Sequence, residues 1–212
     1  MIYSRPVFVK SKFTGGHYAF KTKKSKKPFE NPMNINRSIK LLPNDIVCDI
    51  GAYVGEYSMW ASKYAKKVYS YEPTPYTFSI LKQNKRHNME LINMAVVGTD
   101  EKHINLYLSK GIGVTNSVVK EKDEFIKVPA IKYEKALRDA TVVKIDVEGA
   151  EYKYMIIQPQ LRAIILEFHP IAKKPWREWA LNIMTDIEAS GYKPVKRPTF
   201  KSGWSLTGSW QK

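Results

Sequence analysis

The stretch from residue 45 to residue 73 constrains the fold of this chain more than any other part of the sequence. An apolar run at 46–48 leads into the string Asp-Ile-Gly-Ala-Tyr-Val-Gly at 49–55, and the residues after it have the small and apolar spacing of a helix. A second apolar run then ends in Glu72 and Pro73. This order predicts a strand, a tight turn, a helix and a second parallel strand, which is the repeating unit of a doubly wound sheet.

The two glycines and the acid of this stretch point to a nucleoside. Gly51 and Gly55 let the backbone turn tightly and approach a ligand, because neither carries a Cβ. Glu72 follows the turn by about 20 positions, where an acidic strand end accepts hydrogen bonds from ribose hydroxyls. The pattern predicts a nucleoside-cofactor site. The alternative is an ordinary strand–helix–strand unit with a structural glycine turn.

The spacing of the glycines disfavours NAD and FAD. A dinucleotide fingerprint reads Gly-x-Gly-x-x-Gly, whereas Gly51 and Gly55 are separated by three residues. Asp49, directly before the turn, is unsuited to a pyrophosphate, which binds to backbone N–H groups and a helix dipole. A carboxylate at this place favours a ligand that carries a cationic group.

A third parallel strand is predicted from 91 to 97. Its carboxyl half holds Asn93, Met94 and Ala95, where the adenine of an edge-bound cofactor would lie. Packing alone explains the alternation nearly as well. The segment 100–131 reads as an insertion with two further strands, and we expect it to form a flap that faces the substrate.

Two further strand ends carry chemistry. One buried strand contains Lys144 and leads into Asp146 and Glu148, which are costly in an apolar setting unless they pair or function. The next strand ends in Glu167 and His169, which share a face because side chains alternate along a strand. We expect the two ends to bring Asp146, Glu148, Glu167 and His169 together beside the cofactor.

The net charge of +15 is concentrated at the two ends of the chain. Residues 1–40 hold 10 basic residues and one acid, and residues 191–212 hold 5 basic residues and no acid. Residues 41–190 hold 20 basic and 19 acidic residues and are nearly neutral. Such segregation fits an anionic partner such as a nucleic acid equally as well as a tail that only aids solubility.

The charge pattern also sets the predicted domain organisation. A basic, aromatic arm spans 1–34, with a short hairpin around Gly15 and Gly16, and its Lys23 and Lys24 are candidate substrate contacts. A single domain spans 35–212 and ends in a helix closed by a glycine and then a basic antiparallel hairpin at 191–212.

Composition places few other limits on the protein. The single cysteine, Cys48, lies in an apolar strand and offers neither a disulfide nor a metal-binding spacing. No run approaches the length of a membrane span, and the basic N-terminus has no apolar segment typical of a secretion signal. We therefore expect a cytoplasmic protein without a membrane partner. The sequence does not indicate an oligomeric state.

Four strings, taken in order, resemble the FkbM family of methyltransferases. They are Asp-Ile-Gly-Ala-x-x-Gly at 49–55, Glu-Pro-x-Pro at 72–75, Lys-Ile-Asp-Val-Glu-Gly-Ala-Glu at 144–151 and Glu-Phe-His at 167–169. The third string is the specific one, and the resemblance covers about residues 44–170. Tyr53 departs from the family pattern, because an asparagine is common there.

The resemblance implies an α/β fold with a Rossmann-like, doubly wound and mostly parallel sheet. It also implies S-adenosylmethionine as the cofactor and O-methylation of a hydroxyl on a sugar, a polyketide or a similar metabolite. The predicted cofactor contacts are Asp49, Gly51, Ala52, Tyr53, Gly55, Glu72, Pro73, Asn93, Met94, Ala95 and Asp146.

Methyl transfer is an in-line displacement, so the enzyme must align the hydroxyl oxygen with the methyl carbon and remove a proton. The predicted catalytic residues are Asp146, Glu148 and His169, with His169 or Asp146 favoured as the base. Lys144 and Glu167 are predicted substrate contacts. No metal site is assigned, although the same acids and histidine include possible ligands of a divalent cation.

Two other functions stay open at this stage. The basic ends suit an RNA or DNA methyltransferase that modifies a ribose or another hydroxyl, because no Asn-Pro-Pro-Tyr string for base N-methylation is present. A nucleic-acid-binding protein that kept the fold and lost catalysis is the other alternative.

Overall fold

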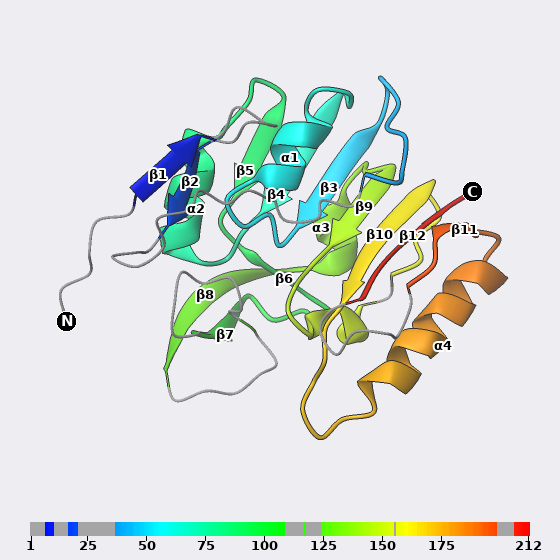
Figure 1. Cartoon of the computed structure of the whole chain (residues 1–212). Coiled ribbons are helices and arrows are strands. Elements are labelled where there is room, and N and C mark those ends of the chain that lie inside the picture. The colour runs from blue at the N-terminus through cyan, green and yellow to red at the C-terminus, as the bar shows by residue number, and fades with distance from the viewer. Residues whose placement is uncertain are drawn as a thin grey trace.

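The structure is a computed structural model that describes residues 7–10, 17–20, 37–108, 117, 124–154, 156–198 and 206–212. The predicted substrate contacts Lys23 and Lys24 lie outside the described residues. Figure 1 shows the arrangement of the elements, with one large sheet at the centre and a smaller one below it.

Seven strands form the large sheet, in the order β11-β12-β10-β9-β3-β4-β5. The five strands from β5 to β10 are parallel, and β12 is antiparallel to both β10 and β11. This confirms a mostly parallel sheet that ends in an antiparallel pair. The strands are β3 (Ile46–Ile50), β4 (Lys67–Tyr71), β5 (Met89–Ile92), β9 (Val142–Ile145), β10 (Ala163–Phe168), β11 (Lys193–Lys196) and β12 (Leu206–Gln211).

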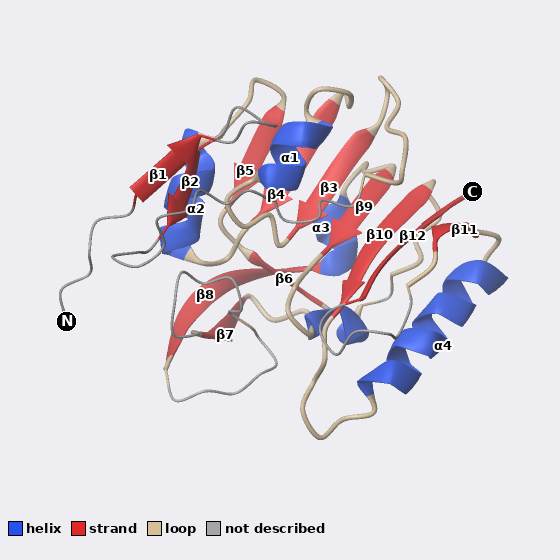
Figure 2. Cartoon of the chain, in the orientation of Figure 1, coloured by secondary structure: helices blue, strands red, loops and turns tan. Residues whose placement is uncertain are grey.

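Helices cover both faces of this sheet (Figure 2). One face packs against α1 (Glu56–Ala61) and α2 (Pro75–Gln83). The other packs against α3 (Tyr133–Leu137), α4 (Trp176–Ala189) and the 3-10 helix η1 (Ala150–Lys153). Adjacent residues of one strand, such as Val47 and Cys48, therefore enter different cores. Burial on both sides explains why the strands read as continuous apolar runs.

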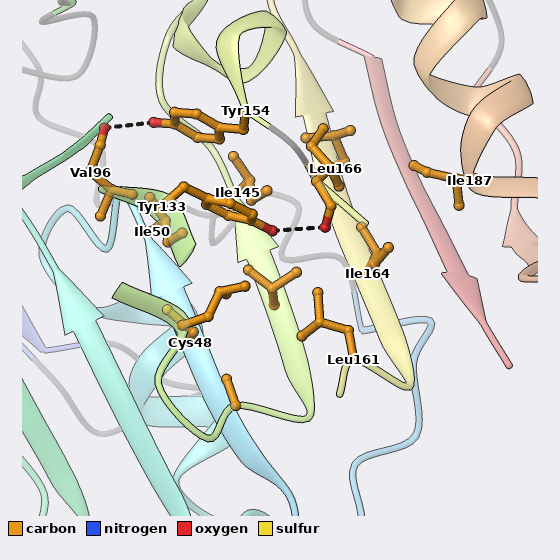
Figure 3. Packing of buried hydrophobic residues seen from close by; sticks show 14 of the residues in the cluster. Cys48, Ile50, Val96, Tyr133, Ile145, Tyr154, Leu161, Ile164, Leu166 and Ile187 are labelled. Carbon is orange, nitrogen blue, oxygen red and sulfur yellow. Dashed lines mark hydrogen bonds between the residues drawn. The ribbon is translucent and has the colours of Figure 1, made fainter. Parts of the chain in front are cut away.

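The core on the α3 side contains a pair of stacked tyrosines (Figure 3). The rings of Tyr133 and Tyr154 are 5.0 Å apart and nearly parallel. The Tyr133 hydroxyl donates to the carbonyl of Ile156 at 3.0 Å, and the Tyr154 hydroxyl donates to that of Val96 at 2.8 Å. Buried tyrosine hydroxyls need such partners, and these two bonds join the segment after η1 to α3 and to Val96.

The single strand predicted from 91 to 97 is wrong, because the structure has two strands there. Residues up to Ile92 pair with β4, and Ala95 begins β6 (Ala95–Val97), which pairs with β8 (Phe125–Lys132) of a second sheet. At the break, the Asn93 side-chain amide donates to the carbonyls of Glu72 at 2.7 Å and Pro73 at 3.1 Å. Asn93 thus pins the chain where it leaves the large sheet.

The second sheet has the order β6-β8-β7, with β7 at His103–Tyr107 and β8 at Phe125–Lys132. These are the two strands predicted within the insertion, and they have a small core of their own. The predicted N-terminal hairpin is also confirmed, as β1 (Val7–Lys10) pairs with β2 (His17–Phe20).

Among the described residues, no helix is both long and apolar enough to pass through a bilayer.

Candidate active site

The strand order changes direction between β3 and β9. From β3 the chain runs outward through β4 and β5, and it then returns to place β9 on the other side of β3 (Figure 1). In sheets of this kind, ligands bind beyond the carboxyl ends of the strands at such a reversal. Asp49, Lys144 and Asp146 all lie at this place.

The turn after β3 presses against the end of β9. Gly51 has a φ of 80°, and the backbone N–H groups of Gly51 and Ala52 both donate to the carbonyl of Tyr71. A Cβ added to Gly51 would lie 1.8 Å from the carbonyl oxygen of Asp146. Only glycine fits here, because both the conformation and the contact exclude a side chain.

Asp49 is fully buried beneath this turn. Its Oδ2 accepts a hydrogen bond from Ser58 Oγ at 2.6 Å, and Ser58 in turn lies 2.7 Å from Ser70 Oγ. Its Oδ1 has no hydrogen-bond partner among the described residues and lies 3.6 Å from Lys144 Nζ. Burial raises the pKa of Asp49, and the Lys144 ammonium opposes that rise. The Asp49 carboxylate therefore lies beneath the turn, next to the Lys144 ammonium.

Glu72 lies at the end of β4 and holds the same turn. Its carboxylate accepts hydrogen bonds from the backbone N–H of Tyr53 at 3.0 Å and of Thr74 at 2.8 Å. Burial raises the pKa of Glu72 to about 7, against the opposing effect of these two bonds. Tyr53 has a φ of 52°, a conformation that an asparagine adopts more easily than a tyrosine.

The three predicted adenine contacts separate in the structure. Asn93 lies directly after β5 and bonds to the loop that follows Glu72. Met94 is partly buried against the core on the α3 side, and Ala95 is buried in the first position of β6. Of the three, Asn93 is the one whose side chain joins the Glu72 loop.

The four predicted residues at the ends of β9 and β10 do come together, and we call Asp146, Glu148, Glu167 and His169 the strand-end cluster. Nε2 of His169 lies 3.4 Å from Glu148 Oε1, 3.6 Å from Asp146 Oδ1 and 3.9 Å from Glu167 Oε1. His169 is only 6% exposed. Burial alone would lower the pKa of His169, but the surrounding carboxylates, Glu151 first, raise it to about 9.

Lys144 connects this cluster with Asp49. Its ammonium donates to Asp146 Oδ2 at 3.0 Å and lies 3.6 Å from Asp49 Oδ1. Although burial lowers it, the charges of Asp146 and Asp49 hold the pKa of Lys144 above its usual value. The same ammonium, with the His169 imidazole, keeps the pKa of Asp146 low despite burial. Lys144 therefore has carboxylate partners within the protein.

Glu151 is a site residue that the sequence analysis did not single out. It is fully buried, and its Oε1 accepts the backbone N–H of His169 at 2.6 Å and lies 3.5 Å from the imidazole Nδ1. Its Oε2 accepts the N–H of Gly149 at 2.8 Å. The sequence feature that could have identified Glu151 is its position as the last acid of the string at 144–151.

The insertion also reaches the cluster. Ser117, an isolated described residue, is buried, and its hydroxyl donates to the carbonyl of Glu148 at 2.8 Å. Glu148 itself has a φ of 53°. This contact places part of the predicted flap beside the strand-end cluster.

Solved methyltransferases have the same fold. The FkbM methyltransferase of Methylobacillus flagellatus KT aligns with a TM-score of 0.55 at 12% identity, over 81% of this chain and 44% of that one. An rRNA methylase from Streptococcus thermophilus gives 0.52 at 11%, over 81% and 89%. TYW2 of M. jannaschii, solved with AdoMet, gives 0.51 at 16%, over 100% and 90%. Among curated proteins, the search found no match.

The fold is that of class I S-adenosylmethionine-dependent methyltransferases, and the carboxyl groups at its strand reversal suit their cationic cofactor. The family can be stated more narrowly, because the model of the methyltransferase FkbM domain matches residues 49–194. The chain belongs to the FkbM family of methyltransferases. It spans about 44% of the length of the Methylobacillus protein.

The residues present fit S-adenosylmethionine, which carries an ammonium and a sulfonium group. Among the described residues, five carboxyl groups lie at the strand reversal and around it, namely Asp49, Asp146, Glu148, Glu151 and Glu167, and two basic side chains, Lys144 and His169, lie with them. The site therefore has an excess of negative charge whether or not His169 is protonated. The turn at Gly51 and the acid Glu72 would hold the nucleoside part, and the cofactor would supply the electrophilic methyl group.

Proposed function

We propose that this chain transfers the methyl group of S-adenosylmethionine to a hydroxyl oxygen of a sugar or another small metabolite. A hydroxyl is a weak nucleophile that must lose its proton during the transfer, so the enzyme needs a proton acceptor next to the methyl group. The observation that carries the proposal is the strand-end cluster, where one imidazole and three carboxylates converge at the carboxyl ends of β9 and β10.

The position of the cluster supports hydroxyl chemistry. It lies beside Lys144 and Asp49, at the strand reversal where the cofactor is expected. Its proton acceptors are carboxylates that are partly exposed, with 29% of the Asp146 side chain and 25% of the Glu167 side chain accessible. A small hydroxylated acceptor would meet these groups directly.

The test is a transfer assay with radiolabelled S-adenosylmethionine and a panel of free sugars, nucleotide sugars and glycosides. We expect label in an alkali-stable ether on one acceptor class. His169→Ala and Glu148→Gln should each lower kcat by about 100-fold or more, because each removes a member of the strand-end cluster that takes up the hydroxyl proton, and proton transfer contributes that much. S-adenosylhomocysteine should still bind to both variants. Label only in amines or esters would contradict the proposal.

A nucleic acid is the second candidate acceptor, and a basic hollow on the described surface favours it. The hollow has a volume of about 720 Å³ and is lined by Lys66, Lys67, Phe78, Lys82, Lys85, His87, Asn88, Met89, Glu90 and Leu91. Lysines beside an aromatic ring suit a phosphate backbone with stacked bases. The hollow adjoins the amino ends of β4 and β5, however, whereas the strand-end cluster lies at the carboxyl ends of β9 and β10. We therefore rank a small acceptor first.

A further inference from the structure

We propose that Asp146, Glu148 and His169 bind one divalent cation between the ends of β9 and β10, and that the acceptor hydroxyl coordinates to this cation. The cation site stands on the geometry of these three side chains. Its use in binding the hydroxyl rests on the proposed function.

The spacing of the three side chains suits a shared ion. Each offers one ligand atom, and the three atoms lie within 4.8 Å of one another. His169 Nε2 is 3.4 Å from Glu148 Oε1 and 3.6 Å from Asp146 Oδ1. Two atoms bound to one ion at about 2.1 Å stand roughly 3.0–3.5 Å apart, whereas a charged hydrogen bond would draw them to about 2.8 Å. The two observed distances fit the first arrangement better.

The imidazole of His169 gives an independent reason. It is more than nine-tenths buried and points its Nε2 into the cluster, and its Nδ1 has no hydrogen-bond partner among the described residues. That Nδ1 lies 3.5 Å from the carboxylate of the fully buried Glu151. A metal-bound histidine usually turns its second nitrogen to a carboxylate, which orients the ring and makes it a better ligand. Glu151 is placed to do this once Nε2 is coordinated.

Lys144 leaves the required oxygen of Asp146 available. Its ammonium bonds to Oδ2 at 3.0 Å, whereas Oδ1 is the atom that faces His169. One oxygen of the carboxylate is thus fixed by an internal partner and the other is directed at the proposed ion. Glu167, at 3.9 Å from Nε2, stands just outside the set of three.

The ligand set indicates the kind of ion. Two carboxylates and one imidazole suit Mg²⁺, Mn²⁺ or another first-row divalent ion, and the set contains no thiolate. Three protein ligands leave coordination positions for water or a substrate oxygen. The Asp146 and Glu148 side chains are 29% and 16% exposed, so these positions open toward solvent.

The cation gives the hydroxyl a defined place and a lower pKa. The hydroxyl oxygen forms a bond to the methyl carbon as the carbon–sulfur bond breaks, and the electron pair of that bond stays on sulfur. The hydroxyl proton passes to the carboxylate of Glu167. The products are the methyl ether and S-adenosylhomocysteine, so atoms and charges balance.

The direct test is a titration of Mn²⁺ into the full chain after chelator treatment. Calorimetry measures the binding, and the electron paramagnetic resonance signal of free Mn²⁺ measures how much stays unbound. We expect one Mn²⁺ per chain, with binding weakened at least tenfold in Asp146→Asn, Glu148→Gln and His169→Ala. Asp100→Asn is the matched control, because Asp100 is an exposed acid paired with Lys132 on the surface. Its Mn²⁺ affinity should equal that of the wild type.

Folding of each variant is checked by its thermal unfolding and by binding of S-adenosylhomocysteine. No Mn²⁺ binding by the wild type, or equal binding by folded His169→Ala, would overturn the cation site. Transfer to a hydroxyl at an unchanged rate in chelator would overturn the role of the cation while the proposed function stands. Specific Mn²⁺ binding without methylation of any hydroxyl would support the cation site and contradict the proposed function.

Discussion

Glu72 illustrates how burial of a single carboxyl group sets a pH dependence. Its pKa in the folded chain is about 7, above the ordinary value of 4.5, chiefly because it is buried. The folded state therefore holds this proton more tightly than the unfolded state does. The stability that follows is complete below about pH 4.5 and is lost as the pH rises to about 7. We expect this loss to be about 3 kcal/mol in the cofactor-free protein.

The measurement is urea unfolding of the wild type and of Glu72→Gln between pH 5 and pH 8. The variant should be less stable at pH 5, because its amide accepts only one of the two hydrogen bonds from Tyr53 and Thr74. It should then lose less stability than the wild type as the pH rises. Parallel curves for the two proteins would show that Glu72 does not titrate in this range.

The same proton should affect binding of the ribose, if the charged form of Glu72 is the one that accepts from its hydroxyls. A ligand that needs the ionised form binds in proportion to its population. With a pKa of about 7, affinity for 5′-methylthioadenosine should rise about tenfold between pH 6 and pH 8. This ligand lacks the amino acid part of the cofactor, so its own amine does not interfere. Fluorescence or calorimetric titration gives the affinity, and a flat profile would remove Glu72 from the site.

Gly51 and Gly191 distinguish two reasons for a glycine, namely lack of space for a side chain and a backbone conformation that side chains disfavour. Gly51 and Gly191 have similar φ values of 80° and 88°, but a Cβ at Gly51 meets the carbonyl of Asp146 while one at Gly191 meets nothing within 4 Å. Gly191→Ala should cost about 1–2 kcal/mol, the strain of a side chain in this conformation. Gly51→Ala should cost at least about 3 kcal/mol, because β3 and β9 must also move apart.

Chemical denaturation of both alanine variants measures these costs. Binding of S-adenosylhomocysteine should fail in Gly51→Ala and persist in Gly191→Ala, since only the first lies at the strand reversal. Equal losses of stability would mean that the contact with Asp146 is unimportant.

At the scale of elements, the amino ends of the strands are joined by an ion pair whose carboxylate, Asp45, is buried and whose partner, Arg162, is partly exposed. Asp45 precedes β3, and its Oδ1 accepts from Arg162 Nε at 2.7 Å and from Thr141 Oγ1 at 3.0 Å. Its Oδ2 accepts from the backbone N–H of Leu42 at 2.6 Å and from Arg162 Nη2. Thr141 and Arg162 directly precede β9 and β10. The pair thus sets the starting points of three neighbouring strands.

Removing this carboxylate should be costly. Asp45→Ala should lower the free energy of unfolding by about 2–4 kcal/mol, because Arg162 and two other donors lose their acceptor. Although burial raises it, Arg162 holds the pKa of Asp45 below its ordinary value. The contribution is therefore present above about pH 4 and is lost as the pH falls through the lowered pKa.

Asp100→Ala is the control for an ion pair, because the Asp100 side chain is 68% exposed and pairs with Lys132 at 3.0 Å. It should hardly change stability. Denaturation at pH 7 and at pH 3 compares the two variants with the wild type. A loss in Asp45→Ala that is no larger than that in Asp100→Ala would refute the structural role of the pair between Asp45 and Arg162.

For the whole molecule, the open question is whether the concentrated positive charge binds a nucleic acid. Replacing Lys66, Lys67, Lys82 and Lys85 with glutamine tests the basic hollow. If single-stranded RNA binds there, the affinity should fall and the slope of its logarithm against salt should flatten. The matched change in the N-terminal arm, Lys23, Lys24, Lys26 and Lys27 to glutamine, tests the arm. RNA binding that neither set alters would exclude both surfaces.

Local patterns predicted a large part of the fold. Most strands of the parallel sheet, the long helix and the final antiparallel pair were evident from apolar runs and turn residues. The run from 91 to 97 was misleading, because its apolar residues belong to two different sheets and periodicity does not reveal a change of partner. The bond from Asn93 to the Glu72 loop, which marks the break, joins residues about 20 positions apart.

The sequence by itself determined the sheet type and the family, because those depend on the spacing of glycines, acids and apolar residues along short stretches. It also indicated that the strand-end cluster would converge, since parallel strands end at one edge of a sheet. Only the tertiary structure decided how each group acts. It buried Asp49 beneath the turn, turned Lys144 to Asp146 and set Glu151 behind His169. These pairings depend on burial and on distances between separate elements, which no local pattern encodes.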